Sequence, residues 1–260
     1  MTVLDELAEE ARRRVERSRK EVPIEELKRR CSKMSPRGFP FEDALRKDGM
    51  SFICEVKKAS PSKGVIAEIF PYLEIAEDYE RAGASCISVL TEPSRFLGDI
   101  RYLAEIAEAV GIPVLRKDFV VDEYMVYEAR CAGASAVLLI CSILDESQLK
   151  SLIGLCDSLS LSALVEAHDE DEVRRALRCG ARVLGVNNRD LRDFSVDHRN
   201  CLRLRPLVPD DVLFVAESGI KSRQDIEDLE MNGVDAVLIG ETLMRADDRC
   251  AKLRELRRLT

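Results

Sequence analysis

The segment Arg81-Ala-Gly-Ala-Ser85 gives the clearest sign of the architecture, because variants of it recur along the chain. It returns as Cys131-Ala-Gly-Ala-Ser135, Cys179-Gly-Ala-Arg182 and Asn232-Gly-Val-Asp235, which places one glycine roughly every 50 residues. Each glycine follows a helix-like segment and precedes an apolar run, as expected where a residue in the left-handed region closes a helix. Each of these four glycines stands for two strand–helix units, so the repeats predict eight units in all.

Apolar runs typical of strands accompany these repeats, and amphipathic segments such as 100–110 separate them. The runs lie at 51–57, 84–90, 112–116, 134–141, 161–166, 182–187, 211–217 and 234–239. Strands that are apolar along most of their length and alternate with helices imply a parallel sheet covered by helices. The pattern therefore predicts an α/β fold, a closed (β/α)8 TIM barrel. An open doubly wound sheet is the alternative, weakened because no Gly-x-Gly-x-x-Gly follows the first strand.

Residues 1–48 precede the repeats and are interpreted as an N-terminal helical extension packed on the barrel, within one domain spanning 1–260. An apolar stripe with helical spacing begins the extension, at Leu4, Leu7, Ala8, Ala11 and Val15. The basic residues of this helix, at 12–14, 17, 19 and 20, are interpreted as a solvated face rather than a membrane or nucleic-acid contact. Pro23 can start a second short helix, and 41–45 a third.

The composition excludes several classes of protein. With 46% apolar and 34% charged residues, the chain can bury a core and stay soluble. A net charge of −8 argues against a general nucleic-acid binder, and no apolar run reaches the roughly 18 residues of a membrane span. The N-terminus lacks a signal peptide's apolar core. The nine cysteines include no Cys-x-x-Cys pair and are interpreted as reduced, buried residues of a cytoplasmic protein.

Polar residues gather where the predicted strands end, which is the face that carries the site in such barrels. These residues are Glu55, Lys57, Lys117, Glu166, Asn187, Arg189, Glu217, Ser218, Gly219 and Gly240. Any one of them can be a structural charge or turn residue, as Glu55 and Lys57 would be if they only paired, but six strand ends converging on one mouth favour a site. Glycines after the last two strands, each leading into a helix, suit a phosphate group. His168 and His198 are interpreted as surface residues, and with two histidines in the chain a zinc site is not expected.

Six motifs in this order resemble indole-3-glycerol-phosphate synthase, a family of the tryptophan pathway. They are Glu-Val-Lys-Lys-Ala-Ser-Pro-Ser-Lys-Gly at 55–64, Leu-Arg-Lys-Asp-Phe at 115–119, Val-Glu-Ala-His at 165–168, Val-Asn-Asn-Arg-Asp-Leu at 186–191, Ala-Glu-Ser-Gly-Ile at 216–220 and Leu-Ile-Gly-Glu-Thr-Leu-Met at 238–244. The resemblance covers nearly the whole chain and implies the same barrel with an N-terminal extension.

The resemblance implies ring closure of 1-(2-carboxyphenylamino)-1-deoxyribulose 5-phosphate to indole-3-glycerol phosphate, with loss of CO₂ and water and without a cofactor or metal. Lys117 matches the family's general acid and Glu166 its general base. Lys57 matches a second lysine for substrate and dehydration, and the division of acid work between the two lysines stays open. Glu55, Asn187 and Glu217 complete the catalytic network by the same resemblance. A lysine is expected to act as the acid only if desolvation or neighbouring cations lower its pKa.

The resemblance also implies binding roles. Ser60 and Arg189 match positions that hold the anthranilate carboxylate, and Phe119 matches an apolar wall for the ring. The phosphate grip corresponds to Ser218, Gly219, Gly240 and the backbone of Glu241. Some relatives carry Ser at 241, so a weaker grip is expected, with the Glu241 carboxylate pointing away. Asn188 is assigned no role.

Two other functions stay open from the residues alone. One is a different isomerase or aldolase acting on a sugar phosphate, since a fold does not fix a function. The other is a barrel kept as a binding subunit, which the charged strand ends argue against. The expected partners are a small phosphorylated substrate, with no nucleic acid and no membrane. The expected state is a monomer, with association with other tryptophan-pathway enzymes left open, and loop 58–64 is expected to close over the substrate.

Overall fold

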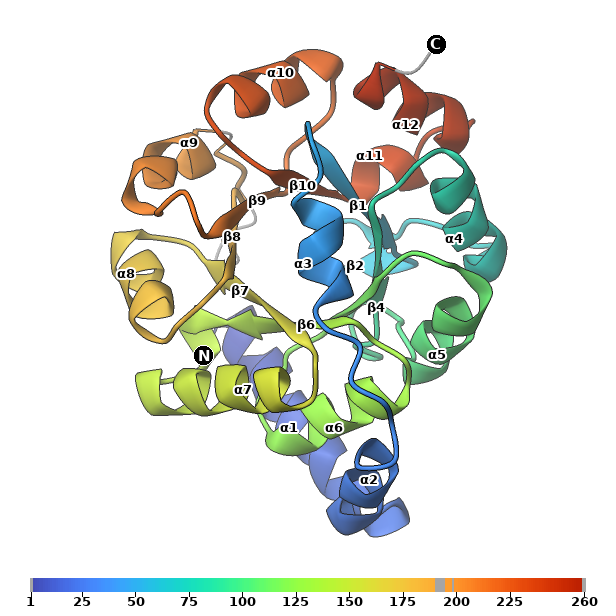
Figure 1. Cartoon of the computed structure of the whole chain (residues 1–260). Helices are drawn as coiled ribbons and strands as arrows, with labels where there is room; N and C mark the ends of the chain where they lie inside the picture. The colour runs from blue at the N-terminus through green and yellow to red at the C-terminus, as the bar shows by residue number, and fades with distance from the viewer. Residues whose placement is uncertain (1, 190–194, 198, 259–260) are drawn as a thin grey trace.

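The computed structural model describes residues 2–189, 195–197 and 199–258. Eight parallel strands close a barrel in the order β1-β10-β9-β8-β7-β6-β5-β4, and β1 pairs with both β10 and β4 (Figure 1). The strands are β1 (Ser51–Val56), β4 (Cys86–Leu90), β5 (Val114–Lys117), β6 (Ala136–Ile140), β7 (Ser162–Ala167), β8 (Val183–Asn187), β9 (Leu213–Glu217) and β10 (Ala236–Ile239). Each overlaps one of the predicted apolar runs, so the predicted barrel is confirmed.

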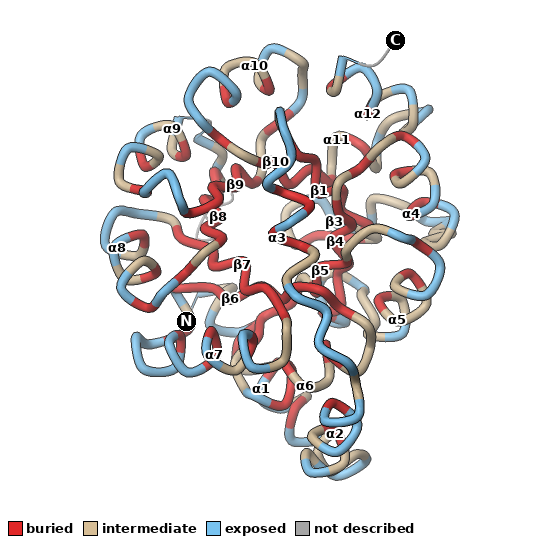
Figure 2. Tube along the Cα trace, viewed as in Figure 1, coloured by how far each residue is buried: buried red, intermediate tan, exposed pale blue. Residues whose placement is uncertain are grey.

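Helices surround the barrel and bury the outer faces of its strands. They are α4 (Tyr72–Arg81), α5 (Ile100–Ala109), α6 (Glu123–Cys131), α7 (Glu146–Ser158), α8 (Glu170–Arg178), α9 (Asn200–Leu204), α10 (Arg223–Met231), α11 (Glu241–Met244) and α12 (Arg249–Arg257), with short 3₁₀ turns at Cys141–Ile143 and Arg205–Leu207. Figure 2 shows the barrel strands almost entirely buried and the outer helices exposed on one side only. This distribution explains why the strands read as apolar runs and the helices as amphipathic ones.

The recurring glycines are confirmed as helix terminators. Gly83, Gly133, Gly180 and Gly233 follow α4, α6, α8 and α10, and their φ angles lie between +72° and +92°. Side chains with a Cβ rarely adopt this conformation, so glycine stops each helix and turns the chain into the next strand.

Helix α3 (Pro40–Leu45) lies across the N-terminal end of the barrel, over the centre of the strands in Figure 1. Its buried Glu42 accepts hydrogen bonds from the Ser162 hydroxyl at the start of β7 (3.1 Å) and from the Arg182 guanidinium just before β8 (2.8 Å). This charge-assisted contact fixes α3 to the N-terminal end of the barrel.

The rest of the N-terminal extension consists of α1 (Val3–Glu21) and α2 (Ile24–Cys31), and α2 packs against α6. The interpretation of its basic residues as solvated is partly wrong. Arg14 pairs with the fully buried carboxylate of Asp118 at 2.6 Å, and Arg19 pairs with Asp122 at 2.7 Å. Both partners follow β5, so these two arginines attach α1 to the barrel rather than to water.

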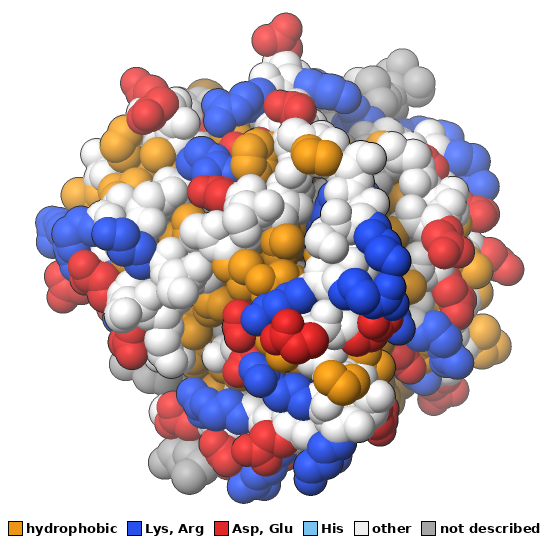
Figure 3. Space-filling model, turned by 60° about the horizontal axis from the view of Figure 1, so that its bottom comes forward, with side chains coloured by type: hydrophobic (Ala, Val, Ile, Leu, Met, Phe, Trp, Pro, Cys, Tyr) orange, Lys and Arg blue, Asp and Glu red, His pale blue; other side chains and the backbone are white. Residues whose placement is uncertain are grey.

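The outer residues of the same helix behave as predicted. Arg12 and Arg13 form exposed ion pairs with Glu9, and such pairs contribute little to stability. Figure 3, which brings the α1 and α2 side forward, shows cationic and anionic side chains interspersed there. In the described part of the chain, no helix combines the length and apolar character needed to cross a bilayer.

A small hairpin follows the first barrel strand. Its strands β2 (Ala59–Ser60) and β3 (Gly64–Val65) pair antiparallel, and Ile66 and Ala67 donate backbone hydrogen bonds to the Lys58 carbonyl. The hairpin thus has an anchored base and an exposed second strand.

Candidate active site

A cavity of about 550 Å³ opens at the C-terminal ends of the barrel strands. Every residue proposed for the site from the sequence lines it: Glu55, Lys57, Ser60, Lys117, Phe119, Glu166, Asn187, Arg189, Glu217, Ser218, Gly219, Gly240 and Glu241. Val3, Leu4 and Leu7 of α1 also line the cavity. The barrel topology therefore brings together residues proposed for the site that are as many as 186 positions apart in the sequence (Glu55 to Glu241).

Lys117 lies between two carboxylates in the cavity. Its Nζ lies 3.4 Å from Glu166 Oε2 and 3.4 Å from Glu217 Oε2, and both carboxylates are almost fully buried. Glu166 Oε1 and Glu217 Oε1 are buried without a hydrogen-bond partner. Buried acceptors of this kind are costly unless a ligand uses them.

Glu55 and Lys57 form a second ion pair, with Lys57 Nζ 2.5 Å from Glu55 Oε1. Gly240 at the end of β10 makes room for this pair, because a Cβ built there would lie 3.0 Å from Lys57 Nζ and closer still to the Glu55 carboxylate. Glycine at this position is therefore required by a close approach.

The pKa of Lys117 is shifted in the direction opposite to the one that favours a lysine as an acid. Burial alone would lower it, but the carboxylates around the ammonium outweigh burial and hold the pKa above its ordinary value. The condition set from the sequence, a lowered lysine pKa, is therefore not met in the free protein, because the site is rich in carboxylates and not in cations.

The pKa values of the two carboxyl groups beside Lys117 are shifted in opposite directions. Burial would raise the pKa of Glu166, but Lys117 and His168 outweigh it and hold that pKa well below the usual range. Burial, with repulsion from Glu166 and Glu55, raises the pKa of Glu217 to about 8 despite the nearby Lys117. Glu166 is therefore ionised at neutral pH, and Glu217 takes up a proton more readily than Glu166, a separation typical of acid–base sites.

His168 is not a surface residue, which corrects the sequence-based interpretation. Its ring lies between two carboxylates, with Nε2 3.3 Å from Glu166 Oε1 and Nδ1 3.1 Å from Glu172 Oε2. The Nε2 contact lacks hydrogen-bond geometry and is electrostatic. Burial would lower the pKa of His168, but these contacts raise it to about 10, so the ring is a cation at neutral pH. His198 lies outside the described residues.

The loop after β9 has an unusual backbone. Ser218 and Gly219 both have positive φ angles, +67° and +85°, and Thr242 of α11 donates a hydrogen bond to the Ile220 carbonyl. A left-handed conformation at a non-glycine residue carries strain and is found most often at functional sites.

Asn188 was given no role from the sequence, yet it holds this loop in place. Its backbone N–H donates to the Glu217 carbonyl, and its side-chain amide donates to the Ser218 carbonyl at 3.2 Å. The Asn188 side chain in turn accepts a hydrogen bond from the backbone of Cys201. Asn187 beside it faces the cavity and accepts the Arg189 N–H at 3.0 Å.

Charged side chains surround the rim of the cavity near α11. The Glu241 carboxylate lies 3.5 Å from Arg189, 3.6 Å from Lys63 of the hairpin and 3.3 Å from Arg245. Glu241 thus links the β2–β3 hairpin to the opposite side of the mouth.

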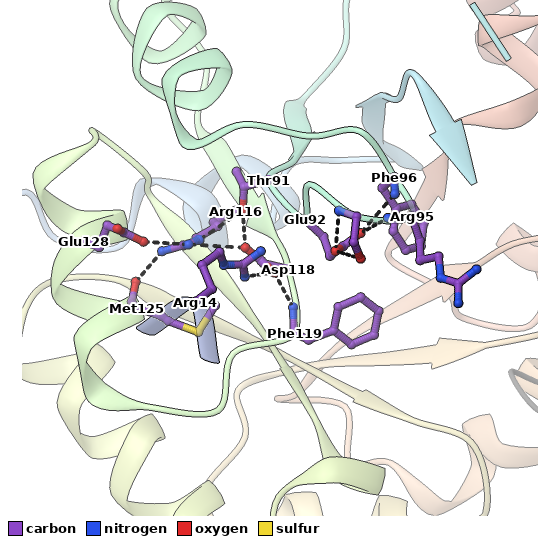
Figure 4. Close-up of polar contacts among 11 residues, drawn as sticks. Arg14, Thr91, Glu92, Arg95, Phe96, Arg116, Asp118, Phe119, Met125 and Glu128 are labelled. Carbon is purple, nitrogen blue, oxygen red and sulfur yellow. Dashed lines mark hydrogen bonds and ion pairs between the residues drawn. The ribbon is translucent and has the colours of Figure 1, made fainter. Parts of the chain in front are cut away.

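A buried polar network holds the strand segment on either side of Lys117 (Figure 4). Arg116 donates to the Met125 carbonyl at 2.7 Å and pairs with Glu128 and Asp118. Asp118 also accepts hydrogen bonds from Thr91 and from its own neighbour, the Phe119 N–H. Because alternate residues of a strand face opposite ways, Arg116 is fixed among the helices while Lys117 faces the cavity.

A second anchor supports the apolar wall. Glu92 accepts backbone hydrogen bonds from Ser94, Arg95 and Phe96, which sets the loop after β4. Phe96 then packs against Phe119, with ring centroids 6.1 Å apart. Among the described residues, no group of three or more His, Cys, Asp or Glu side chains is arranged to bind a metal ion.

Comparisons with known proteins agree with this geometry. A family model described as Indole-3-glycerol phosphate synthase matches residues 4–256. Proteins of that name from Ruminiclostridium cellulolyticum and Endomicrobium trichonymphae are 54% and 51% identical over 256 residues, covering 98% of this chain and 98% and 99% of theirs. Among solved structures, 3-hexulose-6-phosphate synthase from Salmonella typhimurium covers 81% of this chain and 98% of its own, with a TM-score of 0.66 at 17% identity. That likeness concerns the fold alone, whereas the family model and the closely similar sequences show that the chain belongs to the indole-3-glycerol phosphate synthase family.

Proposed function

We propose that this chain carries out the reaction of its family with Lys117 as the general acid and Glu166 as the general base. The reaction closes the ring of 1-(2-carboxyphenylamino)-1-deoxyribulose 5-phosphate, with loss of CO₂ and water, to give indole-3-glycerol phosphate, so the enzyme is a carboxy-lyase. The observation that carries the residue assignment is the position of the Lys117 ammonium, 3.4 Å from both Glu166 and Glu217 within the cavity.

The first step needs a proton at the ketone oxygen while the aromatic carbon attacks the ketone carbon. Lys117 is protonated and partly open to the cavity, so it suits that oxygen. Glu166 is ionised and has one oxygen without a hydrogen bond, so it suits the later removal of a proton. Lys57, held by Glu55, directly follows β1, which is separated from the β5 strand of Lys117 by β4, and it suits the departure of the hydroxyl group.

The binding residues have chemistry that matches the ends of the substrate. Arg189 and Ser60 offer donors for the carboxylate, and Phe119 with Phe96 offers an apolar surface for the ring. At the other side, the strained turn at Ser218 and Gly219 and the start of α11 after Gly240 offer backbone N–H groups for the phosphate.

The acid role can be separated from a purely electrostatic one. Lys117→Arg keeps the positive charge but cannot release its proton, whereas Lys117→Met removes the charge and keeps the chain length. We expect both variants to lower kcat by at least about 10²-fold, measured by the appearance of the indole chromophore. Lys150→Ala, at an exposed position of α7, is the matched control and keeps full activity.

Each outcome decides between the roles. Activity of Lys117→Arg near that of the unchanged protein would show that the site needs a cation at 117 and not an acid. Failure of the unchanged protein itself to convert the substrate would point instead to another sugar-phosphate reaction on the same barrel.

We also propose that the chain is a cytoplasmic monomer with one domain, in which residues 1–48 fold together with the barrel. The contacts of Arg14 and Arg19 with the segment after β5 support joint folding. A single unfolding transition and a sedimentation mass near 29.3 kDa are expected. A separate transition for the extension, or a larger mass, would contradict this.

A further inference from the structure

Two cysteines that are 100 positions apart in the sequence meet between α2 and α6, outside the catalytic cavity. Cys31 is the last residue of α2, and Cys131 is the last residue of α6. Their sulfur atoms lie 3.4 Å apart. Each thiol also lies near a carbonyl of the other helix, Cys31 near Tyr127 O at 3.6 Å and Cys131 near Leu27 O at 3.7 Å. The pair therefore sits inside the contact that joins the N-terminal extension to the barrel.

The surroundings of this pair differ from those of the other cysteines. Cys54, Cys86 and Cys156 are fully buried, and burial raises the pKa of each thiol, which makes them unreactive.

Cys131 is only half-buried, so a small reagent can reach it. The hydrogen bond from Cys31, together with the nearby Arg30 and Arg130, lowers the pKa of Cys131 to about 7 against the effect of burial. The same hydrogen bond keeps the proton on Cys31. Because the two sulfur atoms are 3.4 Å apart, removal of one proton from the pair leaves a thiolate beside a thiol, which is the arrangement that thiol–disulfide exchange requires.

A metal site does not explain the pair. Two thiolates alone do not complete the four-ligand set that a structural zinc needs. Among the residues described by the structure, no third His, Cys, Asp or Glu joins them to form a metal-binding group.

We propose that Cys31 and Cys131 form a reversible disulfide that fastens the N-terminal extension to α6. The oxidant is a low-molecular-weight disulfide such as oxidised glutathione. The Cys131 thiolate attacks one sulfur of that disulfide, which gives a mixed disulfide at Cys131 and releases one glutathione thiolate. Cys31 then loses its proton to solvent and attacks the Cys131 sulfur, which closes the protein disulfide and releases the second glutathione thiolate.

The step is balanced and needs little movement. Two protein thiols are oxidised and one glutathione disulfide is reduced to two thiols. The sulfur atoms must approach from 3.4 Å to about 2.0 Å, which rotation of the two side chains at helix ends can supply.

The site would remain open in the oxidised protein, because neither cysteine lines the catalytic cavity. The extension carries Arg14 and Arg19, which contact Asp118 and Asp122 just after Lys117. Fastening α2 should therefore keep these contacts in place on heating. We expect unchanged activity and a thermal midpoint raised by about 5 °C or more, since a cross-link across a long loop stabilises mainly by restricting the unfolded chain.

The test uses the full chain treated with oxidised glutathione, quenched with iodoacetamide and mapped by mass spectrometry without reduction. A peptide pair joining Cys31 to Cys131 is expected, and it should disappear after dithiothreitol. Cys31→Ser should stop at glutathione attached to Cys131, because the second thiol is missing. Cys131→Ser should form neither product at Cys31, and Cys250→Ser, at another half-buried cysteine, should behave as the unchanged protein.

The proposal would be overturned if the unchanged protein accumulated glutathione at Cys131 without closing the bond, if Cys131 did not react, or if it joined a different cysteine. Because the mapping of the unchanged protein needs no substitution, the result stands even where a serine variant folds poorly. It is also independent of the catalytic roles proposed above.

Discussion

Replacing His168 by Gln should destabilise the protein near pH 6. Above pH 10, where the His168 ring is uncharged in the folded protein, this loss of stability should disappear. The ring lies between the carboxylates of Glu166 and Glu172, which raise its pKa from 6.5 to about 10. At about 1.4 kcal/mol per pKa unit, this rise sets an upper limit of about 5 kcal/mol on its contribution to stability. The side chain is 20% exposed, so solvent screens part of the interaction. We expect a loss of about 2 to 3 kcal/mol, the usual range for hydrogen bonds to charged groups.

The sign of the pH dependence follows from the direction of the pKa change. Because the folded protein holds the His168 proton more tightly than the unfolded chain, the stabilisation is complete below pH 6.5 and fades as the pH rises toward 10. Gln carries no charge at any pH, so the difference between variant and unchanged protein should shrink over that range.

Urea unfolding at pH 6 and pH 10.5 measures this difference. Arg174→Gln, on helix α8 that begins two residues after His168, is the control, because it breaks an exposed ion pair with Glu170 and should cost less than about 0.5 kcal/mol at either pH. An equal loss for His168→Gln at both pH values, or a loss as small as the control's, would show that the ring is not held as a cation.

Three further outcomes are expected. As the pH rises from 5 to 8, the free energy of unfolding of Glu217→Gln should increase by about 2 kcal/mol or more relative to that of the unchanged protein. The reason is that the raised pKa of Glu217 makes its ionisation unfavourable in the folded state over that range. A difference that stays constant with pH in urea titrations would contradict this. Glu241→Ser should lower KM about 3- to 10-fold by removing an anion from the proposed phosphate side, and an unchanged or higher KM in steady-state assays would contradict this. Gly240→Ala should lower kcat at least about 10-fold because the added methyl group meets the Glu55–Lys57 pair, whereas Gly154→Ala in α7, with nothing within 4 Å, should leave it unchanged.

The periodic features of the fold could be predicted from the sequence because they depend on local rules. Gly83 and its counterparts must adopt a left-handed conformation that other residues avoid, so they mark the helix ends directly. Since parallel barrel strands present their C-terminal ends on one face, finding the strands also located Lys117 and Glu166 in the site.

Contacts between distant segments could not be predicted in this way. Nothing in the sequence connects Arg14 to Asp118, so a basic helix face was interpreted as solvated although one of its arginines neutralises a buried carboxylate. His168 is different, because a signal was present and was missed. It lies two residues after Glu166, on the same side of the chain as expected for a strand, and four residues before Glu172. The sequence spacing alone therefore predicts that Glu166 and Glu172 can both contact His168.

The raised pKa of Lys117 constrains the acid role proposed for it. An ammonium held by Glu217, Glu166 and Glu55 is a weak acid, and Glu166 held by cations is a weak base. Matching of pKa values to neutral pH therefore cannot supply most of the rate enhancement. A weak acid can still protonate a ketone oxygen that is becoming an alkoxide, because an alkoxide is a stronger base than an amine. The proton then moves only as the carbon–carbon bond forms, and catalysis depends on a fixed position and a fixed charge at that oxygen. The buried contacts of Arg116 and Asp118 on either side of Lys117 provide such a fixed position, which is why structural residues outside the cavity matter to the chemistry within it.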